Sequence, residues 1–466
     1  MKIKVKNLGP IRQAEFEVGE LTTICGMNNT GKTYITHAMY GFLDYFHNGY
    51  SYLPLDLSRL EKDGQLTVDL EELHAKRNSI AARASKEFSR RHIGQVFGAA
   101  EGAFDDTEII ISGLAENRRL KTLERKTKFG SADKAYLQLE KKSGSTKASI
   151  SLLQESDSEE SLPIPLHLAG ELIGEALKDI VFDRIIPKPF ISSAERTGAA
   201  IFQKELDFTR NRLIEVLGDK SNKLRPYDLF SHFKGTYPVA VRKNVDFIRE
   251  LSSIVDRKSF LLDQHTDFLA EFSDLIGGEY AVNRDGDVQF LPASRKRVKL
   301  SLVESSSSVR SLLDIGFYLR HIAAPGDLLV VDEPELNLHP SIQRRFARLL
   351  ARLVNLDIQV FLTTHSDYII REFNTLLMLN ESQSRHNAIM EREGYSTTEL
   401  LKVEQVRSYF TEERTIKLDD RTNRKKCLTL TSAQIDQKQG IEIKSFDTTI
   451  DFMNRIQDEV MWGGNE

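Results

Sequence analysis

The clearest apolar run in the chain is Leu328 to Val331, which is continuously apolar rather than alternating. Such a run is typical of a parallel strand that is buried on both faces. Two further β-rich runs, Leu21 to Cys25 and Ile358 to Thr364, predict strands of the same kind. Helical patterns follow at Tyr34 to Tyr40 and at Ser341 to Val354. This alternation of strands and helices predicts an α/β fold.

The hydrophobic pattern divides the chain into four parts. Residues 1–45 and 285–380 carry the strands above and predict two lobes of one domain. Residues 46–284 predict a mainly helical insertion with short strands, and 381–466 a C-terminal extension that is a candidate for partner binding. No part of the insertion keeps apolar heptads for the length that a long coiled-coil arm requires.

The strand predicted at Leu21 to Cys25 leads into a glycine-rich loop and then into a helix. Residues 26–33 fit G-x-x-x-x-G-K-[ST] at every position. In this setting the loop N–H groups and the helix N-terminus point at an anion, and glycine lets the backbone approach it closely. The predicted nucleotide-binding residues are Gly26, Asn28, Asn29, Thr30, Gly31, Lys32 and Thr33.

Two adjacent carboxylates end the apolar strand at Leu328 to Val331. We expect Asp332, together with the Thr33 hydroxyl, to hold Mg²⁺, and Glu333 to act as the general base for the attacking water. Lys32 is expected to reach the β- and γ-phosphates of ATP. The alternative is a strand end with two solvated acids, which the phosphate loop upstream disfavours.

The order of the motifs along the chain resembles the ABC ATPase superfamily. A serine run, 305–308, precedes the Asp-Glu strand, and His365 follows the next strand. The resemblance implies that His365 reaches the γ-phosphate and that Ser306 and Ser307 contact ATP bound by the opposite protomer. It also implies an ABC-type head, with a mixed sheet and flanking helices, split by the insertion. One departure is Ser308, where such heads usually carry glycine.

The DEPExxLHP and TTHS strings, at 332–340 and 363–366, resemble the soluble OLD-like and SMC-like branch of that superfamily. Residues 187–196 resemble an E-R segment of this branch, which makes Glu195 and Arg196 candidate switch residues, with a surface salt bridge as the alternative. The chain is most similar to the ATPase subunit family of Septu antiviral systems, PtuA, including retron-associated forms. That resemblance implies a homodimer or higher oligomer and a separate HNH nuclease subunit of the PtuB type. Retron versions add a reverse transcriptase and its branched DNA.

Two other functions remain open on the sequence. One is an SMC-like DNA repair or recombination ATPase that clamps DNA, although the chain lacks a predicted coiled-coil arm. The other is a self-contained OLD-like nuclease, which the absence of a D-x-D motif after His365 disfavours. Basic clusters such as Lys141-Lys142 and Arg424-Lys425-Lys426 indicate solvated faces or, alternatively, a groove that binds nucleic acid.

Composition narrows the setting without changing the chemistry. The net charge of −4 gives no global attraction to nucleic acid, and two cysteines, Cys25 and Cys427, provide neither a disulfide framework nor metal-ligand spacing. No signal peptide or apolar segment of membrane-spanning length is visible, so we expect a cytoplasmic protein without a membrane partner.

Overall fold

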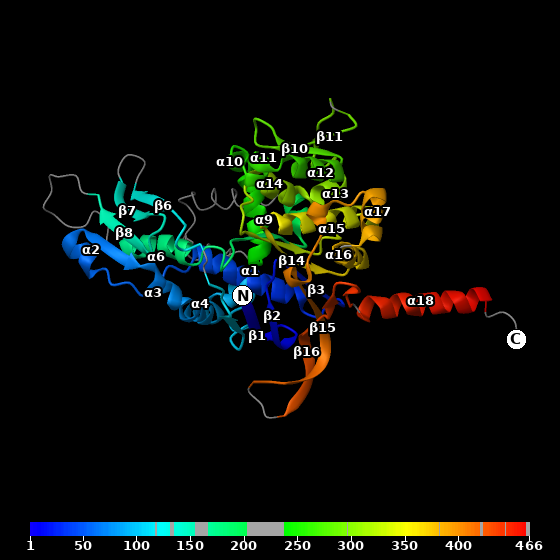
Figure 1. The fold of residues 1–466 in the computed structure, drawn as a ribbon, viewed down its shortest axis with the longest axis horizontal. Helices are drawn as coiled ribbons and strands as arrows, with labels where there is room; N and C mark the ends of the chain where they lie inside the picture. Colours follow the sequence, from blue (N-terminus) through cyan, green and yellow to red (C-terminus); the bar gives the residue numbers. More distant parts are fainter. Residues whose placement is uncertain are drawn as a thin grey trace, which may run out of the picture.

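A six-stranded sheet forms the centre of the molecule in this computed structural model (Figure 1). The structure describes residues 1–116, 119–130, 135–153, 166–202, 237–295, 297–381, 383–419, 423–442 and 444–462. The strand order is β16-β15-β3-β14-β13-β9, in which all neighbours are parallel except the β16–β15 pair. The strands are β3 (Leu21–Gly26), β9 (Pro189–Ser192), β13 (Leu328–Asp332), β14 (Gln359–Thr364), β15 (Val406–Lys417) and β16 (Arg424–Ser432).

Four smaller sheets surround this centre. Their orders are β2-β1-β5, β4-β8-β7-β6, β10-β11-β12 and β17-β18, and each strand pair in them is antiparallel. Their strands are β1 (Lys2–Leu8), β2 (Ile11–Glu17), β4 (Gln65–Asp69), β5 (Glu108–Ser112), β6 (Arg125–Gly130), β7 (Ala135–Lys141), β8 (Lys147–Leu152), β10 (Gly278–Val282), β11 (Val288–Pro292), β12 (Leu300–Ser301), β17 (Ile435–Asp436) and β18 (Gly440–Ile441).

Helices cover both faces of the large sheet and also form separate lobes. The helices before the Asp-Glu strand are α1 (Lys32–Asn48), α2 (Ser58–Asp63), α3 (Leu70–Ala75), α4 (Arg77–Arg91), α5 (Ile93–Val96), α6 (Leu166–Val181), α9 (Val239–Arg249), α10 (Leu251–Ile254), α11 (Phe260–Gln264), α12 (Thr266–Ile276), α13 (Ser307–Ser311) and α14 (Leu313–His321). Those after it are α15 (Pro340–Asn355), α16 (Asp367–Leu379), α17 (Ser384–Glu393), η1 (Thr397–Glu399), η2 (Val403–Gln405) and α18 (Lys444–Trp462).

The large sheet separates two hydrophobic cores, because its central strands are buried on both faces. Along β13, Leu328 and Val330 pack into the core that contains α1, whereas Leu329 and Val331 pack into the core of α14, α15 and α16. This alternation follows from the two-residue period of a strand. It explains why the run from Leu328 to Val331 is apolar at every position. The predicted α/β class is therefore confirmed.

The large sheet crosses the predicted domain boundaries. β9 lies within the predicted insertion but pairs with β13, and β15 lies within the predicted extension but pairs with β3. Both segments thus join the same sheet as the phosphate loop, because neighbouring strands satisfy each other's backbone groups regardless of sequence distance. The insertion also contains the four-stranded sheet of β4, β6, β7 and β8, beside helices α2, α3 and α6 (Figure 1).

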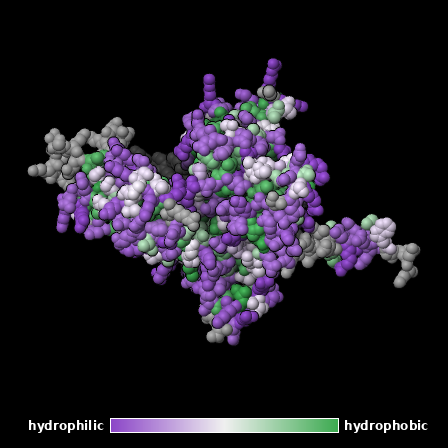
Figure 2. Space-filling model, in the orientation of Figure 1, coloured by the Kyte–Doolittle hydropathy of each residue, from purple (hydrophilic) through white to green (hydrophobic). Residues whose placement is uncertain are grey.

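The surface agrees with this arrangement of cores. The face seen in Figure 2 is mainly hydrophilic, with apolar residues scattered over it. Helix α18 extends away from the body of the molecule (Figure 1). Part of the segment predicted as a mainly helical insertion, residues 203–236, lies outside the described residues. Within the described residues, none of the helices combines the length and the apolar character that crossing a bilayer requires.

Candidate functional site

The C-terminal ends of the parallel strands meet at one edge of the large sheet. Gly26 ends β3, Thr364 ends β14, Asp332 ends β13 and Ser192 ends β9. Because these strands all run in the same direction, the loops that follow them lie side by side. The loop 26–31, which we call the P-loop, therefore faces the Asp-Glu strand end, although about 300 residues separate them in the chain.

The P-loop adopts a conformation that requires glycine at two positions. Gly26 has φ 145° and Gly31 has φ 94°, both in a region that other residues rarely adopt. A Cβ at Gly26 would collide with the Thr411 hydroxyl of β15, and one at Gly31 would lie 2.8 Å from Ile11 Cγ1. Asn29, with φ 62°, supplies a third left-handed residue. The loop is therefore wrapped tightly against β15 and the β1–β2 turn.

Lys32 folds back into the P-loop. Its Nζ donates to the carbonyl oxygens of Gly26 at 3.0 Å and Met27 at 2.8 Å, and the residue is 5% exposed. Burial lowers the pKa of Lys32, while the nearby acids Glu333 and Asp332 oppose that shift. An ammonium held by two loop carbonyls lies where it can exchange them for phosphate oxygens.

Asp332 is fully buried beneath the P-loop helix. Its Oδ1 accepts a hydrogen bond from the Thr363 hydroxyl, but its Oδ2 has no hydrogen-bond partner, and His37 Nε2 of α1 lies 3.7 Å from that oxygen. Burial raises the pKa of Asp332 and lowers that of His37. An unsatisfied buried carboxylate oxygen costs about 1–3 kcal/mol. That oxygen suits a cation, which fits the Mg²⁺ that this site is predicted to hold.

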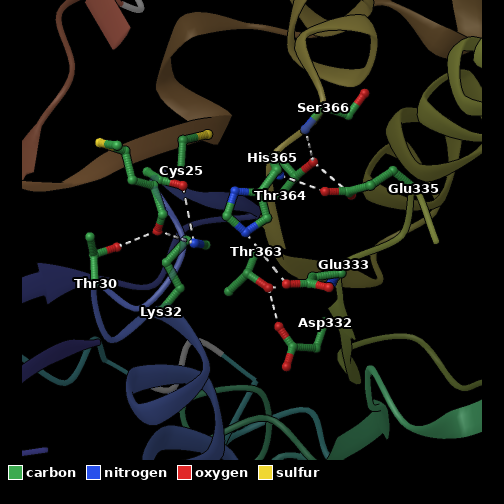
Figure 3. Close-up of polar contacts among 12 residues, drawn as sticks. Cys25, Thr30, Lys32, Asp332, Glu333, Glu335, Thr363, Thr364, His365 and Ser366 are labelled. Carbon is green, nitrogen blue, oxygen red and sulfur yellow. Dashed lines mark hydrogen bonds and ion pairs between the residues drawn. The ribbon is translucent and has the colours of Figure 1, made fainter. Parts of the chain in front are cut away.

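Glu333 and His365 face each other beside the P-loop (Figure 3). Glu333 Oε1 lies 3.4 Å from His365 Nε2, and each side chain is 28% exposed. The hydrogen bond from His365 lowers the pKa of Glu333, so its carboxylate is ionised at neutral pH and can accept a proton. Glu333 has φ 51°, and such strain in a residue other than glycine is found preferentially at functional sites.

Arg196 occupies a buried position rather than the surface. Its guanidinium donates to four backbone carbonyls, those of Ser311 at 2.8 Å, Ser193 at 2.9 Å, Asp332 at 2.7 Å and Glu333 at 2.9 Å. Burial lowers the pKa of Arg196. These bonds connect the end of β9, the end of β13 and helix α13, so the surface salt bridge considered for Arg196 is wrong.

The serine segment lies apart from this cluster. Ser306 caps α13, since its hydroxyl accepts from the Val309 N–H at 3.3 Å, and both Ser306 and Ser307 are exposed. Among the residues that the structure describes, neither is part of the pocket wall around the P-loop. The neighbour of Arg196, Glu195, is also exposed.

One pocket brings most of the predicted nucleotide site together. Residues 28–34 form one wall, Glu333, Glu335, Leu336 and His365 form the opposite wall, and Pro10 lies at the edge. In the described parts of the chain, no group of three or more His, Cys, Asp or Glu side chains is placed to hold a metal ion. A metal at this site would thus depend on Thr33, Asp332 and the phosphates themselves.

Four residues that matter to the site are absent from the sequence prediction. His37 and Thr363 both contact Asp332. Glu335 accepts from the His365 backbone, and Thr411 contacts the Thr30 hydroxyl. His37 stands four residues after Thr33, so the helical period places both on one face of α1. For Thr411, only the pairing of β15 with β3 brings the contact about.

The chain matches the model of one known protein family over most of its length. The family model described as "AAA ATPase domain" matches residues 1–165 and 193–370. No curated protein matches the chain. Among solved structures, an SMC head domain from Thermotoga maritima is 13% identical, with 80% of this chain and 90% of that chain covered, at a TM-score of 0.27.

Two further solved structures contain SMC heads with a partner. One is an SmcHead bound to the C-winged helix domain of ScpA, at 12% identity, 80% and 91% coverage and a TM-score of 0.31. The other is a head with an extended coiled coil bound to the C-terminal domain of ScpA, derived from Pyrococcus furiosus, at 10% identity, 98% and 98% coverage and a TM-score of 0.32.

Proposed function

The chain belongs to the AAA ATPase domain family, and we propose that it is the ATP-hydrolysing subunit of an anti-phage defence complex that closes as a dimer around ATP. The observation that carries the ATPase part is one pocket: Lys32, Glu333 and His365 line it together, although they come from three separate segments of the chain. The resemblance to the Septu ATPase subunit supports the defence role.

Each residue of the pocket has a separate task in this proposal. Lys32 leaves the carbonyls of Gly26 and Met27 and binds the β- and γ-phosphates. Glu333 accepts a proton from the attacking water, and His365 fixes the orientation of that carboxylate and reaches the γ-phosphate. Mg²⁺, held through Thr33 and Asp332, would neutralise charge on the phosphates.

The serine segment supports a site that is shared between two chains. Ser306 and Ser307 are exposed, and they stand outside the pocket of their own chain. In a closed dimer they would donate to the γ-phosphate held by the partner, so hydrolysis would require two heads.

A complementation assay tests the shared site. Lys32→Ala removes the phosphate contact, and Ser307→Arg places a bulky cation at an exposed position that the fold tolerates. Each variant alone should be inactive. Mixing them creates heterodimers with one intact site, which should restore about one quarter of the wild-type rate. A Ser307→Arg variant that hydrolyses ATP at the wild-type rate would refute the trans contact.

The partner proposed for the complex is a separate HNH nuclease, with a reverse transcriptase and its branched DNA in a retron version. Helix α18 supports binding of such a partner by the C-terminal extension, because it exposes large apolar side chains, among them Phe452, Val460 and Trp462, the last 79% exposed. Copurification from the native operon followed by mass spectrometry should recover an HNH protein with the full chain. Deletion of 443–466 should release it and leave ATP hydrolysis intact.

The DNA-clamping alternative has less support from the charges. Lys141 is buried, and its Nζ donates to the Leu123 carbonyl at 2.6 Å. Lys426 pairs with Glu413 at 2.8 Å. The arginines of α15 also contact acids: the pairs are Arg344–Glu372, Arg345–Asp274, Arg348–Glu399, Arg352–Asp267 and Arg352–Glu271. Each of these cations has a carbonyl or carboxylate partner in the chain, and a phosphate would have to replace that contact.

A further inference from the structure

The sequence Glu333-Pro334-Glu335 holds His365 from two sides (Figure 3). Glu333 Oε1 faces the imidazole Nε2 at 3.4 Å, while Glu335 Oε1 accepts a hydrogen bond from the His365 backbone N–H at 2.5 Å. Glu335 Oε2 also accepts from the Thr364 hydroxyl at 2.8 Å. The side chain and the backbone of one histidine are therefore bound by two carboxylates that are only two residues apart.

The segment that carries these carboxylates is rigid. Pro334 is buried and has a fixed φ, and Glu333 is held at φ 51° by N–H donation to the Thr363 carbonyl at 3.1 Å. The Leu338 N–H donates to the Glu335 carbonyl at 3.0 Å and closes the turn that follows. A movement of this turn would consequently shift the His365 backbone and the Glu333 carboxylate together.

The hydrogen bond from the His365 N–H to the Glu335 carboxylate has an electrostatic cost, which a neutral acceptor at this position would avoid. Asp332, Glu333 and Glu335 place three acids within four residues of a largely buried site, where their mutual repulsion is weakly screened. A neutral side chain could accept from the same N–H without that repulsion. The carboxylate of Glu335, with two acceptor oxygens, instead fixes both Thr364 and His365.

We propose that Glu335 is a positioning residue for ATP hydrolysis, which acts through His365 by holding its imidazole against the Glu333 carboxylate. This inference rests on the proposed function. Displacement of a catalytic group by about 1 Å can reduce a rate about 100-fold. Glu335 itself need not touch the nucleotide, so its loss should alter turnover more than ATP affinity.

The first test compares Glu335→Ala with Glu335→Gln in the full chain. Glu335→Ala should lower kcat about 10- to 100-fold and leave the Kd for ATP within about threefold. Glu335→Gln keeps an oxygen that accepts from the His365 N–H but loses the acceptor for Thr364, so its kcat should lie between those of the wild type and Glu335→Ala, about three- to tenfold below the wild type. Equal losses of kcat and ATP affinity, with a lower Tm, would mean that Glu335 only supports the fold and would overturn the proposal.

The second test is a double-mutant cycle with His365→Ala. If Glu335 acts only through His365, Glu335→Ala should have no additional effect on kcat in the His365→Ala background. Additive effects would overturn the proposal. Should Glu335→Ala fail to fold, Thr364→Val removes one of the two contacts and should lower kcat about three- to tenfold; an unchanged kcat in that variant would count against Glu335.

These outcomes are distinct from failure of the proposed function. The proposed ATPase site itself would be refuted if the wild-type protein did not hydrolyse ATP, or if its hydrolysis persisted in Lys32→Ala. Wild-type hydrolysis that depends on Lys32, together with an unchanged kcat in Glu335→Ala, would refute only the positioning role.

Discussion

The two ends of strand β13 carry acids in different surroundings: Asp327, just before the strand, is partly buried, and Asp332, at its end, is fully buried. At its start, Asp327 Oδ2 accepts from the Ala324 N–H at 2.9 Å and from the Tyr318 hydroxyl at 3.3 Å. At its end, Asp332 keeps one oxygen without a hydrogen bond. Burial raises the pKa of both carboxyls, that of Asp327 to about 6. Desolvation thus acts at both ends, but Asp327 Oδ2 has two donors, whereas Asp332 Oδ2 beside the P-loop has none.

The difference between the two carboxylates indicates which of them is available to a ligand. The turn before β13 satisfies Asp327 Oδ2, although His47 Nδ1 and Asp183 Oδ2 near the same edge lack a hydrogen-bond partner. At the C-terminal edge, Lys32 Nζ donates to carbonyls of the P-loop. Asp332 has an oxygen without a hydrogen bond, and Glu333 has a strained backbone. Such unsatisfied groups lower stability and are retained where a ligand completes them. Arg196 differs from these residues at the same edge, since its guanidinium donates to four carbonyls, including those of Asp332 and Glu333.

The largest expected effect is at the C-terminal edge of the sheet, beside the P-loop. Lys32→Ala should abolish ATP binding, because the charge-assisted bonds from the ammonium to the phosphates are lost. Equilibrium binding of a fluorescent ATP analogue measures this, with Asp327→Asn at the opposite edge as the matched control. Normal ATP turnover in Lys32→Ala would show that the P-loop does not bind the nucleotide.

Glu333→Gln should separate binding from hydrolysis at the same edge. Loss of a general base typically lowers the rate about 10²- to 10⁴-fold, whereas the shape of the side chain is kept. The variant should bind ATP and accumulate as a closed dimer. Phosphate release and sedimentation velocity with ATP measure the two effects. Hydrolysis at the wild-type rate would mean that a different group activates the water.

Arg196→Leu should be the costliest substitution for stability. It leaves four buried carbonyls without their donor and should lower the free energy of unfolding by about 3 kcal/mol. Urea unfolding measures this value. The control is Glu195→Gln, because Glu195 is exposed and should tolerate the change within about 0.5 kcal/mol. Equal stability of Arg196→Leu and the wild type would contradict the role assigned to the guanidinium.

The smallest effect concerns the opposite edge and depends on pH. The pKa of Asp327 is raised in the folded state, so its contribution to stability is complete below the unfolded pKa of 3.8 and is lost as the pH rises through about 6. Asp327→Asn removes this titration. The variant should exceed the wild type in free energy of unfolding by about 2 kcal/mol at pH 7 and match it near pH 3.5. Parallel unfolding profiles across this range would contradict the assignment.

Local sequence was informative where one short segment contains the whole feature. The strand, loop and helix around Gly26 and Lys32 were predicted together, and the structure has them at Leu21–Gly26 and Lys32–Asn48. The strands predicted at Leu328 to Val331 and Ile358 to Thr364 lie at Leu328–Asp332 and Gln359–Thr364. Each depends on turn residues and periodicity within a few positions, which a single sequence displays.

The sequence failed where strands choose distant partners. The alternating stretch that forms β15 does not reveal that it pairs with β3, so its contact between Thr411 and the P-loop was missed. The segment 187–196 was singled out for Glu195 and Arg196, but the pairing of β9 within it to β13 was not foreseen. The burial of Arg196 depends on both pairings around β13 and on α13, which come from three separate segments.

By itself, the sequence determined the phosphate loop, the Asp-Glu strand end and their order, since glycine, lysine and apolar runs act over a few residues. Only the tertiary structure decided which polar atoms have partners. Asp332 Oδ2 has none, the Arg196 guanidinium donates to four carbonyls, and His365 is contacted by both Glu333 and Glu335. These depend on contacts between residues far apart in the chain, and packing of the parallel sheet brings them within hydrogen-bonding distance.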